Sequence, residues 1–158
     1  MENAKSDSRR CHIRKHKFNL TELLLNLGRE YQEIASYQGK TFHYRGQEIE
    51  LNSDSISIER IVRNLLNNAL KYGRGKISLH WYKIADKAKI IVADNGVGLK
   101  PEEQKHLFEA FYQCRRHKSL GSGLGLSIVK ELADEFNISL NIYSKWKKGT
   151  IVVLQIPL

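Results

Sequence analysis

The sequence has little of what a disulfide-stabilised or membrane-inserted protein needs. It holds two cysteines, Cys11 and Cys114, which lie far apart and have no second cysteine nearby. A metal knuckle or a redox pair is therefore not expected, and the thiols should be reduced. No apolar run approaches the length that crosses a bilayer, and residues 1–17 lack the apolar centre of a signal peptide. We expect a cytoplasmic protein with no direct membrane insertion.

Aromatic residues are missing where a nucleic-acid-binding segment would need them. The net charge of +9 raises the question of such a partner. Residues 1–18 hold six of the 26 Lys and Arg residues but two of the 17 Asp and Glu residues, so much of the excess lies in one tail. No aromatic residues alternate with these basic residues, and no base-reading helix accompanies them. We expect residues 1–15 to be a solvated basic linker or tail, and we expect no nucleic-acid partner.

Residues 16–158 have the size and composition of one folded domain. With 41% hydrophobic and 27% charged residues, the 158-residue chain can bury a core without help from metals or disulfides. Apolar spacing and cap residues predict a helix after Asn19, to about residue 36, and a second that begins at Asp54 or Ser55 and stops at Gly73. We further predict a hairpin of residues 41–45 and 48–51, strands 77–82, 88–93, 138–143 and 150–156, a helix start at Pro101 and a helix over about 124–135.

Asp94 stands where an apolar, β-branched strand runs into two glycines. Gly96 and Gly98 lack side chains where the backbone must turn sharply or approach a flat ligand closely. The Asp94 carboxylate is a natural acceptor for an exocyclic amine such as that of adenine. Taken alone, the pattern fits a tight surface turn equally well.

One face of the second predicted helix carries amides. Asn64, Asn68, Lys71 and Tyr72 follow at i, i+4, i+7 and i+8, which places them along one side. Asparagine is a mediocre helix former and Asn67 adds a third, so a solvated polar face accounts poorly for the whole pattern. An amide oxygen can join the octahedral shell of Mg²⁺, and a lysine one turn on can neutralise phosphate charge.

A long basic connection precedes the last predicted helix. Residues 113–119 include Arg115, Arg116 and Lys118 and show no periodicity, and glycines follow at 121, 123 and 125. The alternative is a mobile surface loop, but a cationic, glycine-bounded connection has the properties of a lid that closes over phosphates. The first amides of the helix that begins at about Leu124 are suited to hold a phosphate.

In this order, four stretches resemble the catalytic ATP-binding domain of sensor histidine kinases, within the gyrase, heat-shock-protein-90, histidine-kinase and mismatch-repair ATPase superfamily. Residues 64–72 look like its asparagine box, 94–98 its first glycine box, 108–111 its phenylalanine box and 121–126 its second glycine box. The resemblance runs from about Phe18 to Leu158. It implies a two-layer α/β sandwich of the Bergerat type, in which a mixed, mainly antiparallel sheet packs on three helices.

The resemblance also implies roles for individual residues. Asp94 would bind the adenine amine of ATP, and Asn68 would bind Mg²⁺. Asn64 and Lys71 would be the catalytic residues at the phosphates, and Tyr72 would lie on the base or ribose side. The other nucleotide-binding residues that it implies are Gly96, Gly98, Phe111, Arg115, Arg116, Lys118, Gly121, Gly123, Leu124, Gly125 and Leu126.

Two departures from the family pattern matter. Gln113 stands where family lids often carry a basic residue, which shifts the expected phosphate contact to Arg115, Arg116 or Lys118. None of the six histidines lies in the His-Glu/Asp-x-x-x-Pro context of a phosphoacceptor. We therefore expect half of an enzyme, a monomer in isolation, whose partners are the dimerisation and phosphoacceptor helices of the parent kinase and a response regulator.

Two alternatives remain open. An ATPase of the gyrase or mismatch-repair branch typically has a glutamate at the position of Asn64, and an amide cannot accept a proton from water as that glutamate does. A non-catalytic regulatory module would bind nucleotide without transferring phosphate, and the intact motifs argue against it.

Overall fold

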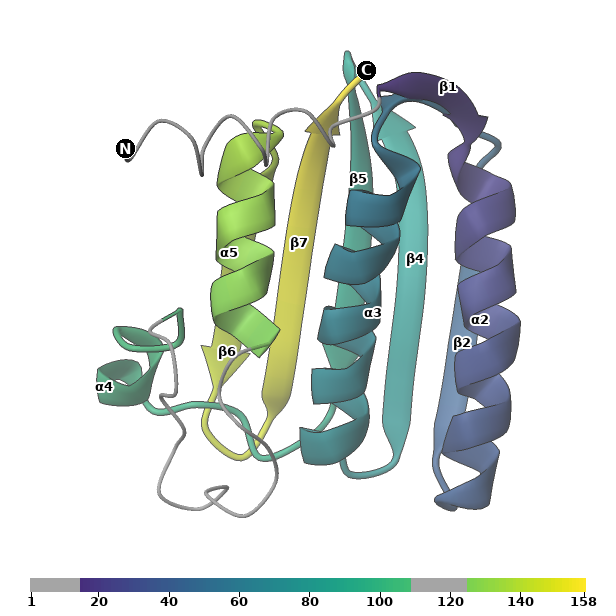
Figure 1. Cartoon of the computed structure of the whole chain (residues 1–158). Helices are drawn as coiled ribbons and strands as arrows, with labels where there is room; N and C mark the ends of the chain where they lie inside the picture. Colours follow the sequence, from purple (N-terminus) through teal and green to yellow (C-terminus); the bar gives the residue numbers. More distant parts are fainter. Residues whose placement is uncertain (1–14, 109–124) are drawn as a thin grey trace, which may run out of the picture.

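The computed structural model describes residues 15–108 and 125–158, which form two layers (Figure 1). Helices α2 (Leu20–Tyr37), α3 (Ser55–Tyr72) and α5 (Gly125–Glu135) cover one face of a sheet. Its strands are β2 (Thr41–Gly46), β4 (Lys76–Ile84), β5 (Lys87–Asp94), β6 (Ser139–Lys145) and β7 (Gly149–Pro157). The short strands β1 (His16–Asn19) and β3 (Glu50–Ser53) pair with each other, and α4 (Pro101–Gln104) is one turn.

The strands of the large sheet lie in the order β2-β4-β5-β7-β6. β2 runs parallel to β4, whereas the β4–β5, β5–β7 and β6–β7 pairs are antiparallel. The resemblance to the kinase domains implies a mixed, mainly antiparallel sheet backed by three helices, and the structure confirms this α/β fold class. The β2-to-β4 connection contains α3, as parallel neighbours require a crossover.

Alternation of apolar and polar residues explains why helices cover only one face. In β4 the side chains of Ile77, Leu79 and Trp81 are buried beneath the helices, while Ser78 and His80 point to the other side. The helices pack on this face through apolar stripes at helical spacing. Within the two described ranges, no helix is both long and apolar enough to cross a membrane.

Both predicted helix caps are confirmed. Asn19 Oδ1 accepts a hydrogen bond from the Glu22 N–H at 2.9 Å at the start of α2. Asp54 Oδ1 accepts from the N–H groups of Ile56 and Ser57 at the start of α3. Each cap satisfies backbone donors that the first helical turn leaves without partners.

The prediction of a hairpin between residues 41–45 and 48–51 is wrong. β2 pairs with β4, and β3 pairs instead with β1. The residue between them explains the difference, because the Gln47 carbonyl accepts hydrogen bonds from Thr21 Oγ1 (2.7 Å) and Trp81 Nε1 (3.0 Å). These long-range contacts hold the connection open, where a hairpin would fold it back on itself.

The helix predicted from Pro101 is short. It ends at Gln104, and residues 105–108 continue as turns. Leu107 nevertheless turns inward and is 9% exposed.

Candidate functional site

Asp94 ends β5 with its half-buried side chain on the helix side of the sheet. Its Oδ1 accepts a hydrogen bond from the Gly96 N–H at 2.8 Å. Burial raises the pKa of Asp94, and the N–H groups of Gly96 and Thr150 and the charge of Lys40 lower it in part. A carboxylate has room for about four hydrogen bonds, so this one keeps acceptor capacity for a donor in the site.

The two glycines of the loop are required by close packing. A Cβ at Gly96 would lie 1.9 Å from the carbonyl oxygen of Tyr72, the last residue of α3. Gly98 has a φ of +67°, and its Cβ would lie 1.9 Å from the carbonyl oxygen of Lys145. The loop therefore runs between the end of α3 and the β6–β7 turn with no space for side chains at these positions.

Hydrogen bonds fix the loop to both neighbours. Asn95 Oδ1 accepts from the N–H groups of Gly75 (3.1 Å) and Lys76 (2.9 Å), which begin the turn into β4. The N–H of Leu99 donates to Ser144 Oγ at 2.8 Å, on the opposite side. Residues 94–100 are thus a preformed wall of the site.

On α3 the three asparagines separate into two roles. Asn64 and Asn68 lie half-buried on the predicted face, and the Asn64 Nδ2 donates to the Arg60 carbonyl at 2.8 Å, which leaves its amide oxygen turned away from that bond. Asn67 points elsewhere, and its Oδ1 accepts from the hydroxyl of Tyr31 in α2 at 2.7 Å. Asn67 therefore ties two helices together, while Asn64 and Asn68 form what we call the amide face.

The start of α5 lies against this amide face. A Cβ at Gly125 would stand 3.3 Å from Asn64 Oδ1. Leu126, the next residue, is partly buried against the hydrophobic core. Seven further residues of the predicted site lie outside the described residues: Phe111, Arg115, Arg116, Lys118, Gly121, Gly123 and Leu124.

Tyr72 and Lys71 complete the predicted set at the end of α3. Tyr72 is half-buried and its carbonyl meets Gly96, whereas the Lys71 side chain is exposed. The last turns of α3, the loop after β5 and the start of α5 lie at one end of the domain (Figure 1). The structure thus brings together the amide face, Tyr72, Asp94, the loop glycines and Gly125, residues that are distant in sequence.

The donors of the amide face fit a divalent cation such as Mg²⁺. Within residues 15–108 and 125–158, no cluster of three or more His, Cys, Asp or Glu side chains is placed to hold a metal. Neutral amide oxygens suit a hard cation that receives its remaining ligands from phosphates and water. Asn68 is the better placed donor, because its side chain makes no hydrogen bond to the described residues, whereas that of Asn64 does.

Sequence reasoning missed four residues that shape the site. Lys40 Nζ donates to the Leu70 carbonyl near the end of α3, and its charge reaches Asp94. Ser144 and Thr150 hold the loop and Asp94 from the β6–β7 side. Asn95 had a local signal, since an Asn-Gly pair is typical of turns. Lys40, Ser144 and Thr150 act across 45 or more residues of chain or across elements, so no local sequence pattern indicates them.

A family model matches residues 53–158, and its description reads histidine kinase-, DNA gyrase B- and HSP90-like ATPase. Among curated proteins, the sensor histidine kinase YkoH of Bacillus subtilis is 37% identical over 112 residues. That match covers 69% of this chain and 25% of YkoH. The autoinducer 2 sensor kinase/phosphatase LuxQ of Vibrio vulnificus is 30% identical over 167 residues, covering 98% of this chain and 20% of LuxQ. The chain therefore spans about a quarter or less of these two relatives.

Solved structures share the fold. The mycobacterial sensor histidine kinase MprB superposes with a TM-score of 0.79 at 24% identity, covering 91% of this chain and 97% of that one. The catalytic domain of the histidine kinase ThkA gives a TM-score of 0.80 at 22% identity, covering 91% and 95%. The likeness extends over nearly the whole of both chains and shows that the fold is shared.

Proposed function

Because this chain belongs to the histidine kinase-, DNA gyrase B- and HSP90-like ATPase family and is the ATP-binding catalytic domain of a histidine kinase, we propose that it donates the γ-phosphoryl group of Mg-ATP to a histidine on separate dimerisation helices. The same proposal includes a response regulator as the final acceptor and a cytoplasmic location. The multidomain relatives, of which this chain matches a minor part, support a division of labour of this kind.

One observation carries the proposal: the loop that holds Asp94 packs against the last residue of α3, the helix that carries Asn64 and Asn68. A nucleotide with its base at Asp94 would extend its phosphates along the amide face toward the start of α5. Backbone N–H groups at a helix start attract phosphate. The Asp94 loop would therefore take the base of Mg-ATP, the amide face its Mg²⁺, and the start of α5 its phosphates.

In this arrangement the protein positions the nucleotide and neutralises the charge of its phosphates. Asp94 accepts from the adenine amine, and Tyr72 lies beside the base or ribose. Asn68 offers an oxygen to Mg²⁺, which supplies charge neutralisation at the phosphates, while Asn64 and Lys71 orient them. Phosphoryl transfer passes through a loose transition state that needs little covalent work from side chains, so positioning is the main contribution.

The identity of residue 64 separates this proposal from hydrolysis. An ATPase that activates water needs a general base, and an amide at Asn64 does not accept a proton at neutral pH. The carboxylate of the proposed site, Asp94, lies at the end assigned to the base and away from the phosphates. We therefore infer slow hydrolysis and dependence on an external acceptor.

Labelling with γ-labelled ATP tests the proposal. The chain alone should bind nucleotide, remain unlabelled and release phosphate slowly. Addition of dimerisation helices from the parent kinase should give an acid-labile phosphohistidine on those helices, because proximity supplies the missing nucleophile. Self-labelling, or rapid turnover by the chain alone, would contradict the proposal and favour the ATPase branch.

Calorimetric titration with an ATP analogue, with and without Mg²⁺, supplies the control. Binding that Mg²⁺ strengthens, without labelling of any partner, would identify a regulatory nucleotide-binding module. Absence of binding would remove nucleotide from the proposal altogether.

A further inference from the structure

β2 forms one edge of the large sheet and leaves half of its backbone groups without a strand partner. The Thr41 N–H donates to the Gly75 carbonyl (2.7 Å) and the Gln47 N–H to the Trp81 carbonyl (3.1 Å). These two bonds show that the odd-numbered residues of β2 turn their peptide groups toward β4. In a parallel ladder alternate residues face the neighbour, so the peptide groups of Phe42, Tyr44 and Gly46 point outward. Among the described residues, the Phe42 carbonyl alone of these is bonded, to Gln32 Nε2 at 3.2 Å.

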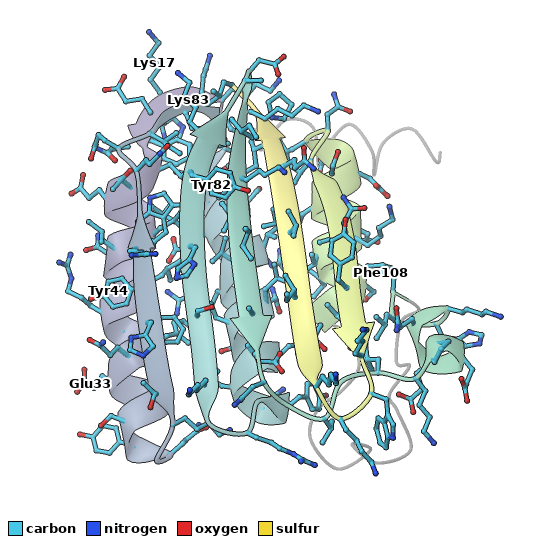
Figure 2. All side chains as sticks on the ribbon, turned by 180° about the vertical axis from the view of Figure 1, so that it is seen from behind. Lys17, Glu33, Tyr44, Tyr82, Lys83 and Phe108 are labelled. Carbon is cyan, nitrogen blue, oxygen red and sulfur yellow. The ribbon has the colours of Figure 1, made fainter. Side chains whose placement is uncertain are left out.

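A hollow of about 650 Å³ opens beside this edge. It is lined by Gln32, His43, Tyr44, Arg45, Ser78 and His80, which are polar side chains with hydrogen-bond donors. No lining residue is acidic. Figure 2 views the sheet from the face that the helices leave uncovered and labels Tyr44 at the edge strand. The ring of Tyr44 turns to the other side, where a Cβ at Gly28 of α2 would lie 2.3 Å from it.

The uncovered face around the hollow is free of acidic residues throughout the five described strands of the large sheet. Its charged members are Arg45, Lys76, Lys87, Lys89 and Lys145, with His43 and His80 between them. Three ion pairs of the described residues lie instead on helices, as between Arg63 and Glu30. The pKa of His80 is lowered by burial and then by Arg45 and His43, with no carboxylate opposing them.

We propose that the edge of β2 binds an extended acidic segment of a partner protein. The segment adds a strand beside Tyr44 through its own peptide groups, and its carboxylates enter the hollow to meet Arg45 and His43. Strand addition gives affinity through the backbone, and pockets beside the edge select alternate side chains. This binding site is separate from the proposed nucleotide site and does not depend on it.

Charge and backbone pairing decide between this occupant and two others. A second copy of the chain carries the same net charge of +9 and would bring like charges together. A single-stranded nucleic acid has no row of N–H and C=O groups to match the edge, and the hollow offers one half-buried aromatic ring for stacking. An acidic peptide satisfies both the edge and the cations.

The test uses the full ¹⁵N-labelled chain and a short capped peptide of alternating glutamate and threonine. Binding should shift the amide signals of residues 42–46 and slow solvent exchange of the Tyr44 N–H, which gains a hydrogen-bond acceptor. Arg45→Gln should weaken binding by about tenfold or more, because a charge-assisted hydrogen bond is lost. Arg60→Gln, which removes the same charge from the exposed surface of α3, should leave affinity within about twofold.

Two further peptides distinguish strand addition from charge attraction alone. Glutamine in place of glutamate should abolish measurable binding, and proline in place of threonine should do the same because it blocks the backbone donors. Equal binding of the proline peptide would overturn the proposal, as would equal weakening by both arginine variants. No shift with the acidic peptide, or tighter binding of oligothymidylate at the same residues, would also overturn it.

Discussion

The loop of residues 94–100 and the amide face of α3 are two parts of the candidate site, and they differ in how much of their geometry is already fixed. The loop is held on both flanks, by Asn95 at the start of β4 and by Ser144 in β6. On the amide face, the Asn68 side chain makes no hydrogen bond to the described residues. The side proposed for the base is therefore preorganised, whereas the side proposed for the phosphates keeps amide oxygens available to a ligand.

The largest expected effect tests the rigidity of the loop. Gly98→Ala places a Cβ against the Lys145 carbonyl in a left-handed conformation and should cost about 3 kcal/mol or more of unfolding free energy. Gly39→Ala is the matched control, since Gly39 has a φ of +69° but nothing within 4 Å of the added Cβ. It should cost about 1–2 kcal/mol, the conformational part alone. Urea unfolding of both variants measures the difference. Equal losses of unfolding free energy would show that the loop can move to make room for the added Cβ.

Asp94→Asn should come next, and its effect should fall on binding. The substitution keeps size but removes a charged acceptor, so affinity for an ATP analogue should fall by about 1.5–3 kcal/mol. The control is Asp134→Asn, because Asp134 is an exposed residue of α5 paired with Lys130. Calorimetry measures both. An unchanged affinity in Asp94→Asn would remove this carboxylate from the site.

Two neighbouring asparagines sharpen the comparison within α3. Asn68→Ala should lower nucleotide affinity by about 1 kcal/mol in the presence of Mg²⁺ and much less without it, since its proposed partner is the metal. Asn67→Ala should leave affinity unchanged and cost about 1 kcal/mol of stability, because it breaks the bond from Tyr31. Titrations with and without Mg²⁺, beside thermal unfolding, distinguish them; an equal loss in both metal conditions would make Asn68 a structural amide.

The smallest expected effect is a change in pH dependence. Burial raises the pKa of Asp94 in the folded state above its unfolded value, so the folded state binds more protons between the two. The contribution of this group to stability is therefore complete below the unfolded pKa and declines as pH rises through the folded pKa. Asp94→Asn should remove that decline from the unfolding profile between acidic and neutral pH. A profile identical to that of the unaltered chain would contradict it.

Much of the fold is predictable because its signals are local. The caps at Asn19 and Asp54, the stripe of α3 and the alternation of β4 and β5 each depend on neighbours within one element. The partners of β2 and β3 are not predictable in this way. Two short strands with a glycine between them read as a hairpin, and only the contacts of Gln47 with distant residues exclude it.

The candidate site likewise contains some residues that a local pattern predicts and others that it does not. The sequence marks Asp94 and its glycines as candidates because a strand, an acid and a turn lie within a few residues. Helical spacing groups Asn64 with Asn68, but the contact that sets Asn67 apart comes from Tyr31, in another helix. Lys40 and Ser144 reach the loop only after the chain has folded, so no local pattern marks them.

The pairing of β1 with β3 has the geometry of a strand pair that opens from one end under tension. His16 lies opposite Ser53 at one end of this ladder, and Asn19 lies opposite Glu50 at the other. Since Ser53 stands just before the cap of α3, a pull on the chain ahead of His16 against an anchored α3 loads the His16–Ser53 pair first. The strands would then peel apart one pair at a time, which takes less force than sliding the whole ladder. Under such a pull, the β1–β3 pair would open before the load reaches α2.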